Sequence, residues 1–389
     1  MRVEVSVDDL LANAEIERAK EVAYSKVRER FDEENVLNLL RVLATLRDAK
    51  SMRKVFRRWR EEHGKFPQSF KEVLALYYLI TLQIDRLLPI LPETPEHVAF
   101  WILTTLGYTE EAKRYDLSKP ARMATVRLLE GYDYQPPQDI PPLEKLFFTF
   151  FNTKRFIVGG EINRAMAYLN EALALSLKQG ALPIALNAMV LRGAFQMNSG
   201  DIEIARYVSQ NLDDRMGLAV AQIYSGLVEG KVPTLEIPER FPILRAMYDY
   251  LRYVVRREGV FKPYEGIRSV YNTWWYLDKI RNGRLYITFA GRLRVVEGNR
   301  VMRLPQKQLL CVAFVKVGGR DLLNRYAPIL FPGSKNPQRR ALENLSRASD
   351  LRFAPSDLYM TLRFGNFLRD EEERWAVVLK EEARRLLSG

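Results

Sequence analysis

The chain has 389 residues, of which 47% are hydrophobic and 28% are charged, and its formal net charge is +12. This composition excludes a chain that is disordered throughout, and the length predicts two or three domains. The single cysteine, Cys311, excludes an intrachain disulfide framework and an all-cysteine metal site. Two histidines leave little for histidine-based metal or acid–base chemistry.

Two segments bear on localisation. The opening sequence MRVEVSVDDL carries acidic residues and no apolar core, so we expect no signal peptide. The most hydrophobic stretch, 73–91, contains Gln83, Asp85 and Arg86, which favours buried helices over a membrane span. With the single cysteine, these features predict a cytoplasmic protein that does not bind a membrane.

Residues 1–280 are predicted to form helices joined by short turns. Apolar residues recur at helical spacing over 36–46 and again over 52–59, where basic residues occupy the other face. Gly64 and Pro67 then interrupt the pattern. Helical spacing returns further along the chain, and we expect the aromatic cluster there to lie in a core or domain interface. That cluster comprises Trp274, Trp275 and Tyr276.

A short motif recurs within this helical region. Gly160-Glu-Ile-Asn-Arg-Ala165 and Gly200-Asp-Ile-Glu-Ile-Ala205 share a Gly-(Glu/Asp)-Ile-x-x-Ala pattern, and Gly107–Ala112 is a weaker copy. Glycine ends a helix and allows a tight turn, and a small alanine allows a neighbouring helix to approach. Residues 145–215 resemble tetratricopeptide repeats of the longer kind found in bacterial regulators, which implies a curved surface suited to a partner. An ordinary helical bundle with coincidental glycines is the alternative.

The positive charge is concentrated near the C-terminus. Residues 281–370 hold seventeen Lys and Arg against six Asp and Glu, a net charge of +11, whereas the whole chain carries +12. A basic segment attached to a near-neutral body is typical of a nucleic-acid-binding domain joined to a part that regulates it. A surface that serves solubility is the alternative, although such charge is usually spread along a chain.

The hydrophobic period changes at Arg284 from that of a helix to that of a strand. The alternation predicts three short strands, over 285–289, 293–296 and 301–304. Proline, glycine and asparagine signals then predict three helices, over 306–317, 322–330 and 337–350. A closing β-hairpin is predicted over 351–353 and 359–363. This order is the outline of a winged helix-turn-helix domain.

An ordered set of short motifs strengthens this interpretation. The set comprises Phe289-Ala-Gly-Arg-Leu-Arg-Val295, Leu304-Pro-Gln-Lys-Gln-Leu-Leu310, Gly318-Gly-Arg320, Leu330-Phe-Pro332, Arg340-Ala-Leu342 and Leu345-Ser-Arg347. It resembles the DNA-binding domain of OmpR/PhoB-type response regulators and, more closely, that of the SARP family of bacterial transcription activators. The segment departs from that family at Ala348-Ser349, where a Leu-Arg pair is common, and in following the helical repeats instead of preceding them.

The third predicted helix would present side chains to the major groove of DNA. The residues expected to face the core are Ala341, Leu342, Leu345 and Ala348. The residues expected to face outward are Arg339, Arg340, Glu343, Asn344 and Arg347. Arginine can form two hydrogen bonds with guanine, and asparagine can do the same with adenine. The alternative is that these arginines are only solvated helix residues.

Four further cations are predicted to contact phosphates, which position a protein on the duplex. Arg352 and Arg363 would lie on the closing hairpin, and Lys307 and Arg303 near the first helix of the module. Cys311 is expected to be a buried structural thiol. The segment 371–387 has the pattern of an amphipathic helix, which we expect to pack on the repeats or on a second copy.

Enzyme function has the least support. The chain has no GxSxG, GxGxxG or GxxxxGK(S/T) motif, and we find no catalytic constellation, cofactor site or metal site. The expected domains are a helical region at 1–140, tetratricopeptide-like repeats at 141–280, the winged module at 281–370 and a C-terminal helix at 371–389.

The sequence therefore predicts a mainly α protein with N-terminal tetratricopeptide-like helical repeats and a C-terminal α+β winged helix-turn-helix domain. The leading hypothesis is a cytoplasmic bacterial transcription regulator that binds double-stranded DNA. Its repeats would sense an effector or bind a partner such as RNA polymerase or a regulatory protein, and a homodimer is left open. The alternative is a scaffold whose winged domain binds protein. In a third version, the basic helix Lys50–Arg60 also contacts nucleic acid.

Overall fold

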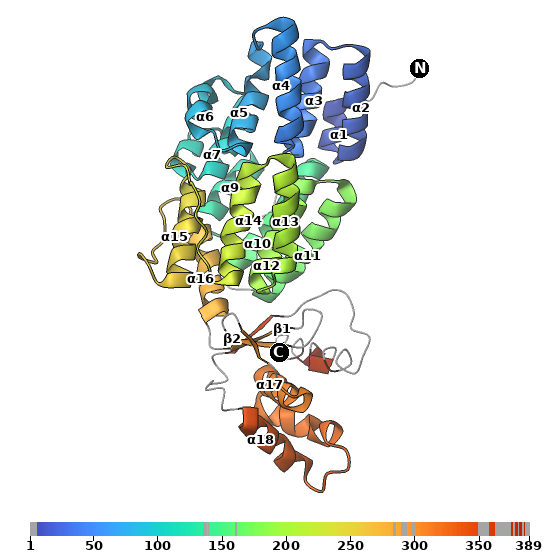
Figure 1. Ribbon diagram of the computed structural model, residues 1–389, viewed down its shortest axis with the longest axis vertical. Coiled ribbons are helices and arrows are strands. Elements are labelled where there is room, and N and C mark those ends of the chain that lie inside the picture. The colour runs from blue at the N-terminus through green and yellow to red at the C-terminus, as the bar shows by residue number, and fades with distance from the viewer. Residues whose placement is uncertain are drawn as a thin grey trace. The chain divides into compact units, whose positions relative to one another are not determined.

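The structure is a computed structural model. It describes residues 6–134, 138, 140–159, 162–282, 285–288, 294–297, 300–302, 304–348, 358–361 and a few positions between 375 and 385. The chain divides into two compact units (Figure 1). Unit 1 comprises residues 1–194 and 198–275, and unit 2 comprises residues 195–197 and 276–389.

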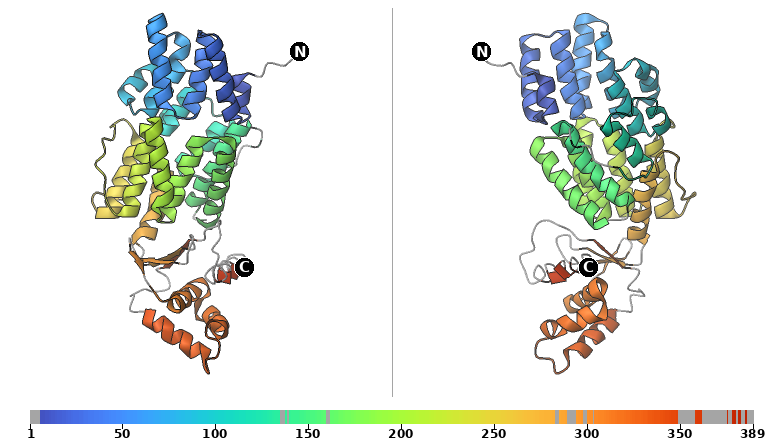
Figure 2. Two further views of the ribbon diagram at one scale, coloured as in Figure 1. Left: turned by 45° about the vertical axis from the view of Figure 1, so that its right-hand side comes forward. Right: turned by 180° about the vertical axis from the view of Figure 1, so that it is seen from behind.

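The described residues of unit 1 form helices joined mostly by short turns, with longer connections at 230–241 and 257–267, and the two views of Figure 2 show them from other sides. Its first helices are α1 (Val7–Ala12), α2 (Ile16–Glu29), α3 (Glu33–Thr45), α4 (Ala49–His63), η1 (Gln68–Phe70), α5 (Lys71–Ile80), α6 (Ile84–Ile90), η2 (Leu91–Glu93), α7 (Glu96–Leu106), α8 (Thr109–Ala112) and α9 (Pro120–Leu129). The following ones are α10 (Pro142–Val158), α11 (Ile162–Gln179), α12 (Leu182–Phe195), α13 (Ser199–Leu212), α14 (Arg215–Glu229), α15 (Pro242–Arg256) and α16 (Arg268–Asn282), of which the last continues into unit 2.

Local sequence accounts for several of these helices. Asp32 caps α3 by accepting a 3.0 Å hydrogen bond from the Asn35 amide, and Asp48 caps α4 by accepting a 2.9 Å bond from the Ser51 amide. Such a cap stabilises a helix by about 1 kcal/mol. The stripe predicted over 36–46 is confirmed, since its side chains are buried along one face of α3.

The predicted interruption after the second stripe is also confirmed. Gly64 ends α4 at a φ of +77°, a conformation that side chains other than glycine rarely adopt. The hydrophobic stretch that follows folds as the two short helices α5 and α6. Among the described helices, none combines the length and the apolar character that a bilayer-spanning segment requires.

The glycines of the repeated motif take different roles. Gly107 ends α7 with a φ of +99°, as predicted, and a Cβ there would lie 2.9 Å from the Ile243 side chain. The prediction for Gly200 is wrong, because Gly200 lies in the first turn of α13 and ends no helix. Ala165 and Ala205 are buried, as expected of small residues between packed helices.

The aromatic cluster near the end of unit 1 contributes to its core. Trp274 on α16 is fully buried, and its ring stacks on Tyr224 of α14 with 5.3 Å between the ring centroids. The expected core position of Trp274 is therefore confirmed, and this contact joins α14 to α16.

The described part of unit 2 contains a four-stranded sheet, the last residues of α16 and two further helices. The strands are β1 (Leu285–Thr288), β2 (Arg294–Glu297), β3 (Arg300–Met302) and β4 (Leu358–Thr361), in the spatial order β3-β2-β1-β4. β1 pairs with β2 and β2 with β3 in antiparallel fashion, whereas β1 pairs with β4 in parallel, with Tyr286 opposite Tyr359.

The two further helices of unit 2 are α17 (Gln306–Leu330) and α18 (Pro337–Ala348). α17 is interrupted at Gly318 and Gly319, whose backbone angles are not helical, so its two halves correspond to the first two helices predicted for the module. Cys311 is fully buried in the core formed by α17 and α18, and burial raises its thiol pKa to about 12. The prediction of a buried thiol is confirmed.

The predicted α+β winged helix-turn-helix fold class is wrong. The described chain is mainly helical, and its strands are few and short. A wing requires an antiparallel hairpin after the last helix, but β4 pairs in parallel with β1. The segment 351–353, which was predicted to form the other arm, lies outside the described residues. Alternating apolar residues indicate an extended backbone, but they do not specify which strand a segment pairs with.

The expected location of the C-terminal helix is wrong as well. The Trp375 ring meets Phe314 of α17 edge to face at 5.7 Å, and Leu379 is fully buried in the core of unit 2. Tyr326 of α17 also donates a 2.7 Å hydrogen bond to Glu382. The described apolar residues of this segment, Trp375, Val378 and Leu379, therefore pack on the core of the basic module itself.

Candidate nucleic-acid interface

α18 begins as the sequence predicts. Asn336 accepts a 3.0 Å hydrogen bond from the Arg339 amide, and Pro337 occupies the first helical position, where its missing N–H has no cost. Ala341 and Ala348 are fully buried against the core of unit 2, and Leu345 packs beside them. These three positions follow the helical spacing of four and three, so they form the inner face of α18.

The outer face of α18 carries most of the predicted DNA contacts. Arg339, Arg340, Glu343 and Arg347 are exposed, and Asn344 is partly buried. The structure therefore confirms their outward placement and brings them together on one helix.

The expectation for Leu342 is wrong, since this side chain is 38% exposed. The inner face is already filled by Ala341, Leu345 and Ala348, and Leu342 lies about 100° around the helix from Ala341. A hydrophobic residue therefore stands among the outward arginines.

The outward cations differ in their electrostatic surroundings. Arg339 donates a 3.1 Å hydrogen bond from Nε to Glu343, which balances one positive charge. Among the described residues, no carboxylate lies within ion-pairing distance of Arg340 or Arg347. These two guanidinium groups are therefore available to an external anion.

Asn344 is engaged within its own helix. Its Nδ2 donates a 2.8 Å hydrogen bond to the carbonyl oxygen of Arg340. A contact to both hydrogen-bonding atoms of adenine would require this bond to be given up. Asn344 is therefore a weaker candidate for base recognition than its arginine neighbours.

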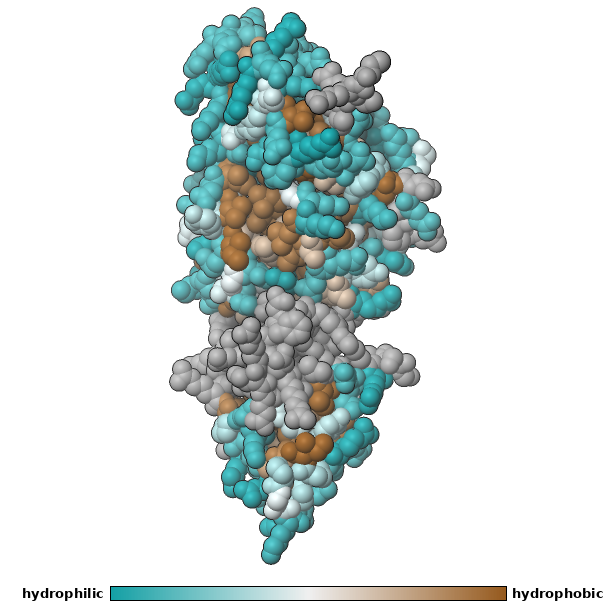
Figure 3. All heavy atoms as spheres, turned by 90° about the vertical axis from the view of Figure 1, so that its right-hand side faces the viewer, coloured by the Kyte–Doolittle hydropathy of each residue, from teal (hydrophilic) through white to brown (hydrophobic). Residues whose placement is uncertain are grey.

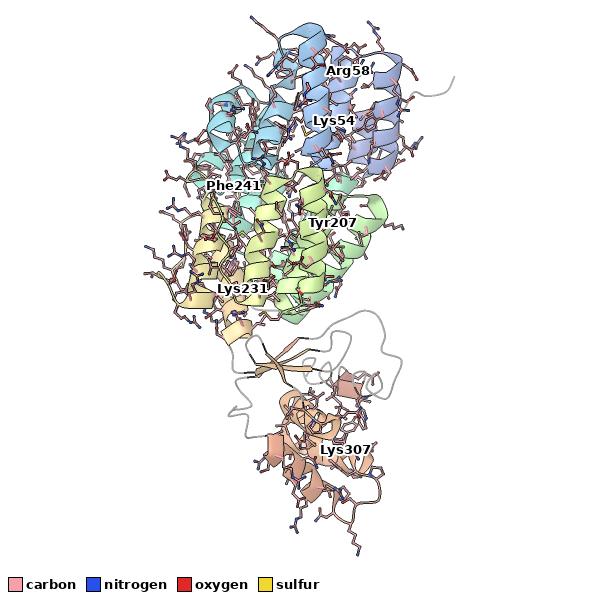
Figure 4. The ribbon with its side chains drawn as sticks, in the orientation of Figure 1. Lys54, Arg58, Tyr207, Lys231, Phe241 and Lys307 are labelled. Atoms are coloured by element: carbon pink, nitrogen blue, oxygen red, sulfur yellow. The ribbon has the colours of Figure 1, made fainter. Side chains whose placement is uncertain are left out.

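The cations predicted outside α18 are only partly described. Lys307, near the start of α17, is exposed, and its ammonium group lies 5.1 Å from the centre of the Phe331 ring (Figure 4). Arg303, Arg352 and Arg363 lie outside the described residues.

Three exposed cations of unit 2 were missed: Arg320, Arg325 and Lys335. Arg325 lies 3.6 Å from Glu382, whereas no ion pair is found for Arg320 or Lys335 within the described part of the chain. The sequence could have indicated these three cations, because residues 306–348 contain eight Lys and Arg against two acidic residues.

The basic helix of the third version, α4, is exposed on its polar face, where Figure 4 marks Lys54 and Arg58. Arg58 is already engaged, because its Nε donates a 2.6 Å hydrogen bond to Glu62 and its guanidinium lies 3.9 Å from the centre of the Phe31 ring. Arg53 bonds Tyr77 and Asp213. α4 therefore offers fewer unpaired cations than its sequence suggests.

Comparisons with known protein families, curated proteins and solved structures found no match to this chain. The resemblances to SARP regulators and to tetratricopeptide repeats stay predictions.

Proposed function

We propose that this protein is a transcription regulator that binds duplex DNA through the outer face of α18, with unit 1 governing that binding. The observation that carries the proposal is the pair Arg340 and Arg347, exposed and without a carboxylate neighbour in the described structure, on a helix held by its opposite face. The inner face of α18 is held by the core of unit 2, and its outer face presents unpaired arginines. This arrangement suits a helix that enters a groove of DNA.

The dimensions are compatible with the major groove. Arg340 and Arg347 are two helical turns apart, which separates their Cα atoms by about 10 Å along the helix axis. The major groove is about 12 Å wide and admits an α-helix, and arginine there contacts guanine O6 and N7. Arg320, Lys335 and Lys307 would supply phosphate contacts around it.

The test is a fluorescence-anisotropy titration of the full chain with random-sequence and genomic duplexes at low salt. We expect binding, and we expect Arg340→Ala/Arg347→Ala to weaken it by about 10-fold or more, because a good arginine–base contact contributes about 1–3 kcal/mol. Lys54→Ala/Arg57→Ala removes the same formal charge from the exposed face of α4 and serves as the matched control. Equal losses in both variants, or no binding to any duplex, would contradict the proposal.

A second candidate function, a scaffold for protein partners, has one observation in its favour. Hydrophobic side chains reach the surface over the middle of unit 1 in Figure 3, and Ile204 and Tyr207 on α13 are 51% and 68% exposed. Crosslinking in cells from a photoreactive residue at position 207 would recover protein and no DNA-bound complex if the scaffold function is correct.

A further inference from the structure

A cavity in the middle of unit 1, between its packed helices, was not anticipated from the sequence. It has a volume of 260 Å³ and is lined by residues of α7, α9, α10, α12, α14, α15 and α16. Several of these helices are far apart in the sequence, but all of them contribute residues to the wall of this cavity. Small-molecule pockets begin at about 300 Å³, so this cavity suits a small ligand with on the order of ten non-hydrogen atoms.

The walls of the cavity are mainly aromatic and aliphatic. Trp101 of α7 stacks on Phe147 of α10 with 6.4 Å between the ring centroids, and Phe150 and Tyr224 also line the space. Phe241, at the start of α15, contributes a further ring and is labelled in Figure 4. Phe147 is 38% exposed and also lines the cavity, so it marks the mouth.

Two cations and no carboxylate line this apolar space. Arg47 is balanced, because its guanidinium lies 3.6 Å from the buried carboxylate of Asp214. Lys154 of α10 is not balanced. Within the described structure, no carboxylate lies within ion-pairing distance of its ammonium group, whose recorded contacts are the rings of Phe150 and Phe151 at 5.4 and 5.8 Å.

The surroundings of Lys154 disfavour its charge. Burial lowers the pKa of this ammonium group to about 8, and no neighbouring charge opposes that effect. Lys154 is partly buried, and a cation in apolar surroundings without a counter-ion is unfavourable, so an anion that paired with it would be stabilising. The side chain lines the cavity, so an anion placed in the cavity would reach it.

A further polar group is available on the wall. Asn187 of α12 lines the cavity and makes no hydrogen bond to another described residue, whereas the hydroxyl groups of Thr104 and Thr125 donate to carbonyl oxygens of their own helices. The site thus combines an apolar body with very few unused polar groups, which is the usual composition of a small-molecule site.

We propose that this cavity binds a small organic carboxylate whose apolar, ring-bearing body fills the aromatic space and whose carboxylate pairs with Lys154. The carboxylate supplies the counter-ion that the protein lacks at this point, and the aromatic walls remove the body of the ligand from water. The inference does not depend on DNA binding, because it concerns unit 1 alone and is tested without DNA.

The experiment uses 3-phenylpropanoate, an acid of eleven non-hydrogen atoms, and its neutral amide 3-phenylpropanamide as probes. Isothermal titration calorimetry of the full chain at pH 7 should show that the acid binds at least about 10-fold more tightly than the amide, since only the acid can form the charge-assisted hydrogen bond. Amide binding equal to that of the acid, or no binding of the acid, would overturn the proposal, and neither result requires a variant.

Lys154→Met tests the assigned partner, because methionine keeps an unbranched apolar chain and removes the charge. We expect it to weaken binding of the acid by about 10-fold or more and to leave the amide unchanged. Lys145→Met, at an exposed position on the same helix, is the matched control and should bind the acid as the natural chain does. Equal affinity of the Lys154→Met and Lys145→Met proteins for the acid would remove Lys154 from the site.

Discussion

Lys154 and Arg340 are both cations without a carboxylate neighbour among the described residues, but their surroundings give them different properties. Arg340 stands in water on the outer face of α18, where its charge has little effect on stability. Lys154 lies among aromatic rings, where its charge opposes folding. The first is suited to a polyanion at the surface and the second to a small anion that enters the cavity.

The environment of Lys154 predicts that the stability of the protein depends on pH. The pKa of Lys154 falls from 10.5 to about 8 on folding, so between these values the unfolded chain binds more protons and stability rises with pH. Lys154→Met should therefore raise the free energy of unfolding by about 1–3 kcal/mol at pH 7, and this gain should shrink as the pH rises towards 10. Urea unfolding of both proteins at several pH values measures it.

Other titrating groups contribute equally to the stability of the natural chain and of Lys154→Met, so they do not affect the difference between the two proteins. Burial raises the pKa of Tyr224 and Tyr250 above the ordinary value, and both tyrosines are present in both proteins. Lys145→Met should show no pH-dependent gain. A gain for Lys154→Met that stays constant from pH 7 to pH 10 would mean that the ammonium group is not held in an unfavourable environment.

At the scale of elements, α12 and α13 each carry a glycine of a pair seven residues apart, and only the one on α12 is needed for the close approach of the two helices. A Cβ at Gly193 would lie 2.7 Å from Ile202 Cγ1 and 2.8 Å from the Asn198 carbonyl oxygen, whereas a Cβ at Gly200 would meet only the Asn198 side chain at 3.5 Å. Gly193→Ala should therefore destabilise the protein by about 1–3 kcal/mol. Gly200→Ala should be neutral or slightly stabilising, because alanine is the better helix former.

Thermal unfolding followed by circular dichroism measures both glycine variants. The pair is well matched, because each change adds one methyl group to the same pair of helices. Similar melting temperatures for the two variants would show that α12 and α13 can move apart at little cost, contrary to the contacts at Gly193.

At the scale of the whole molecule, the separation of charge predicts how DNA binding responds to salt. Nearly all of the net charge of +12 lies within residues 281–370. Each phosphate contact releases counter-ions, so the affinity should fall steeply with salt, and removing two of the proposed phosphate contacts in Arg320→Ala/Lys335→Ala should reduce the slope of log K against log salt by about 2. Anisotropy titrations between 50 and 300 mM salt, on the order of the range used for such slopes, give both values.

The α4 variant Lys54→Ala/Arg57→Ala should keep the slope of the natural chain. A reduction of its slope by the same amount would mean that unit 1 contacts the phosphates as well, as in the third version of the hypothesis. A slope near zero in the natural chain would argue against any electrostatic contact with DNA.

Local features of the sequence determined a good part of this protein. The apolar stripe over 36–46, the end of α4 at Gly64, the cap at Asn336 and the outward face of α18 all depend on neighbours within about seven residues in the sequence. Helical periodicity and capping are properties of one segment, so one sequence can show them. The concentration of charge in residues 281–370 needed only counting.

Tertiary structure alone decided which segments meet. The parallel pairing of β4 with β1, the packing of Trp375 on α17 and the burial of Lys154 each join residues from separate elements. Periodicity tells which side of an element is apolar but not which element covers it, so the wing was expected where the chain forms no such hairpin in its described part. The cavity could not be predicted from the sequence for the same reason. In addition, a lysine on an amphipathic helix ordinarily points into water, so Lys154 gave no indication of a site.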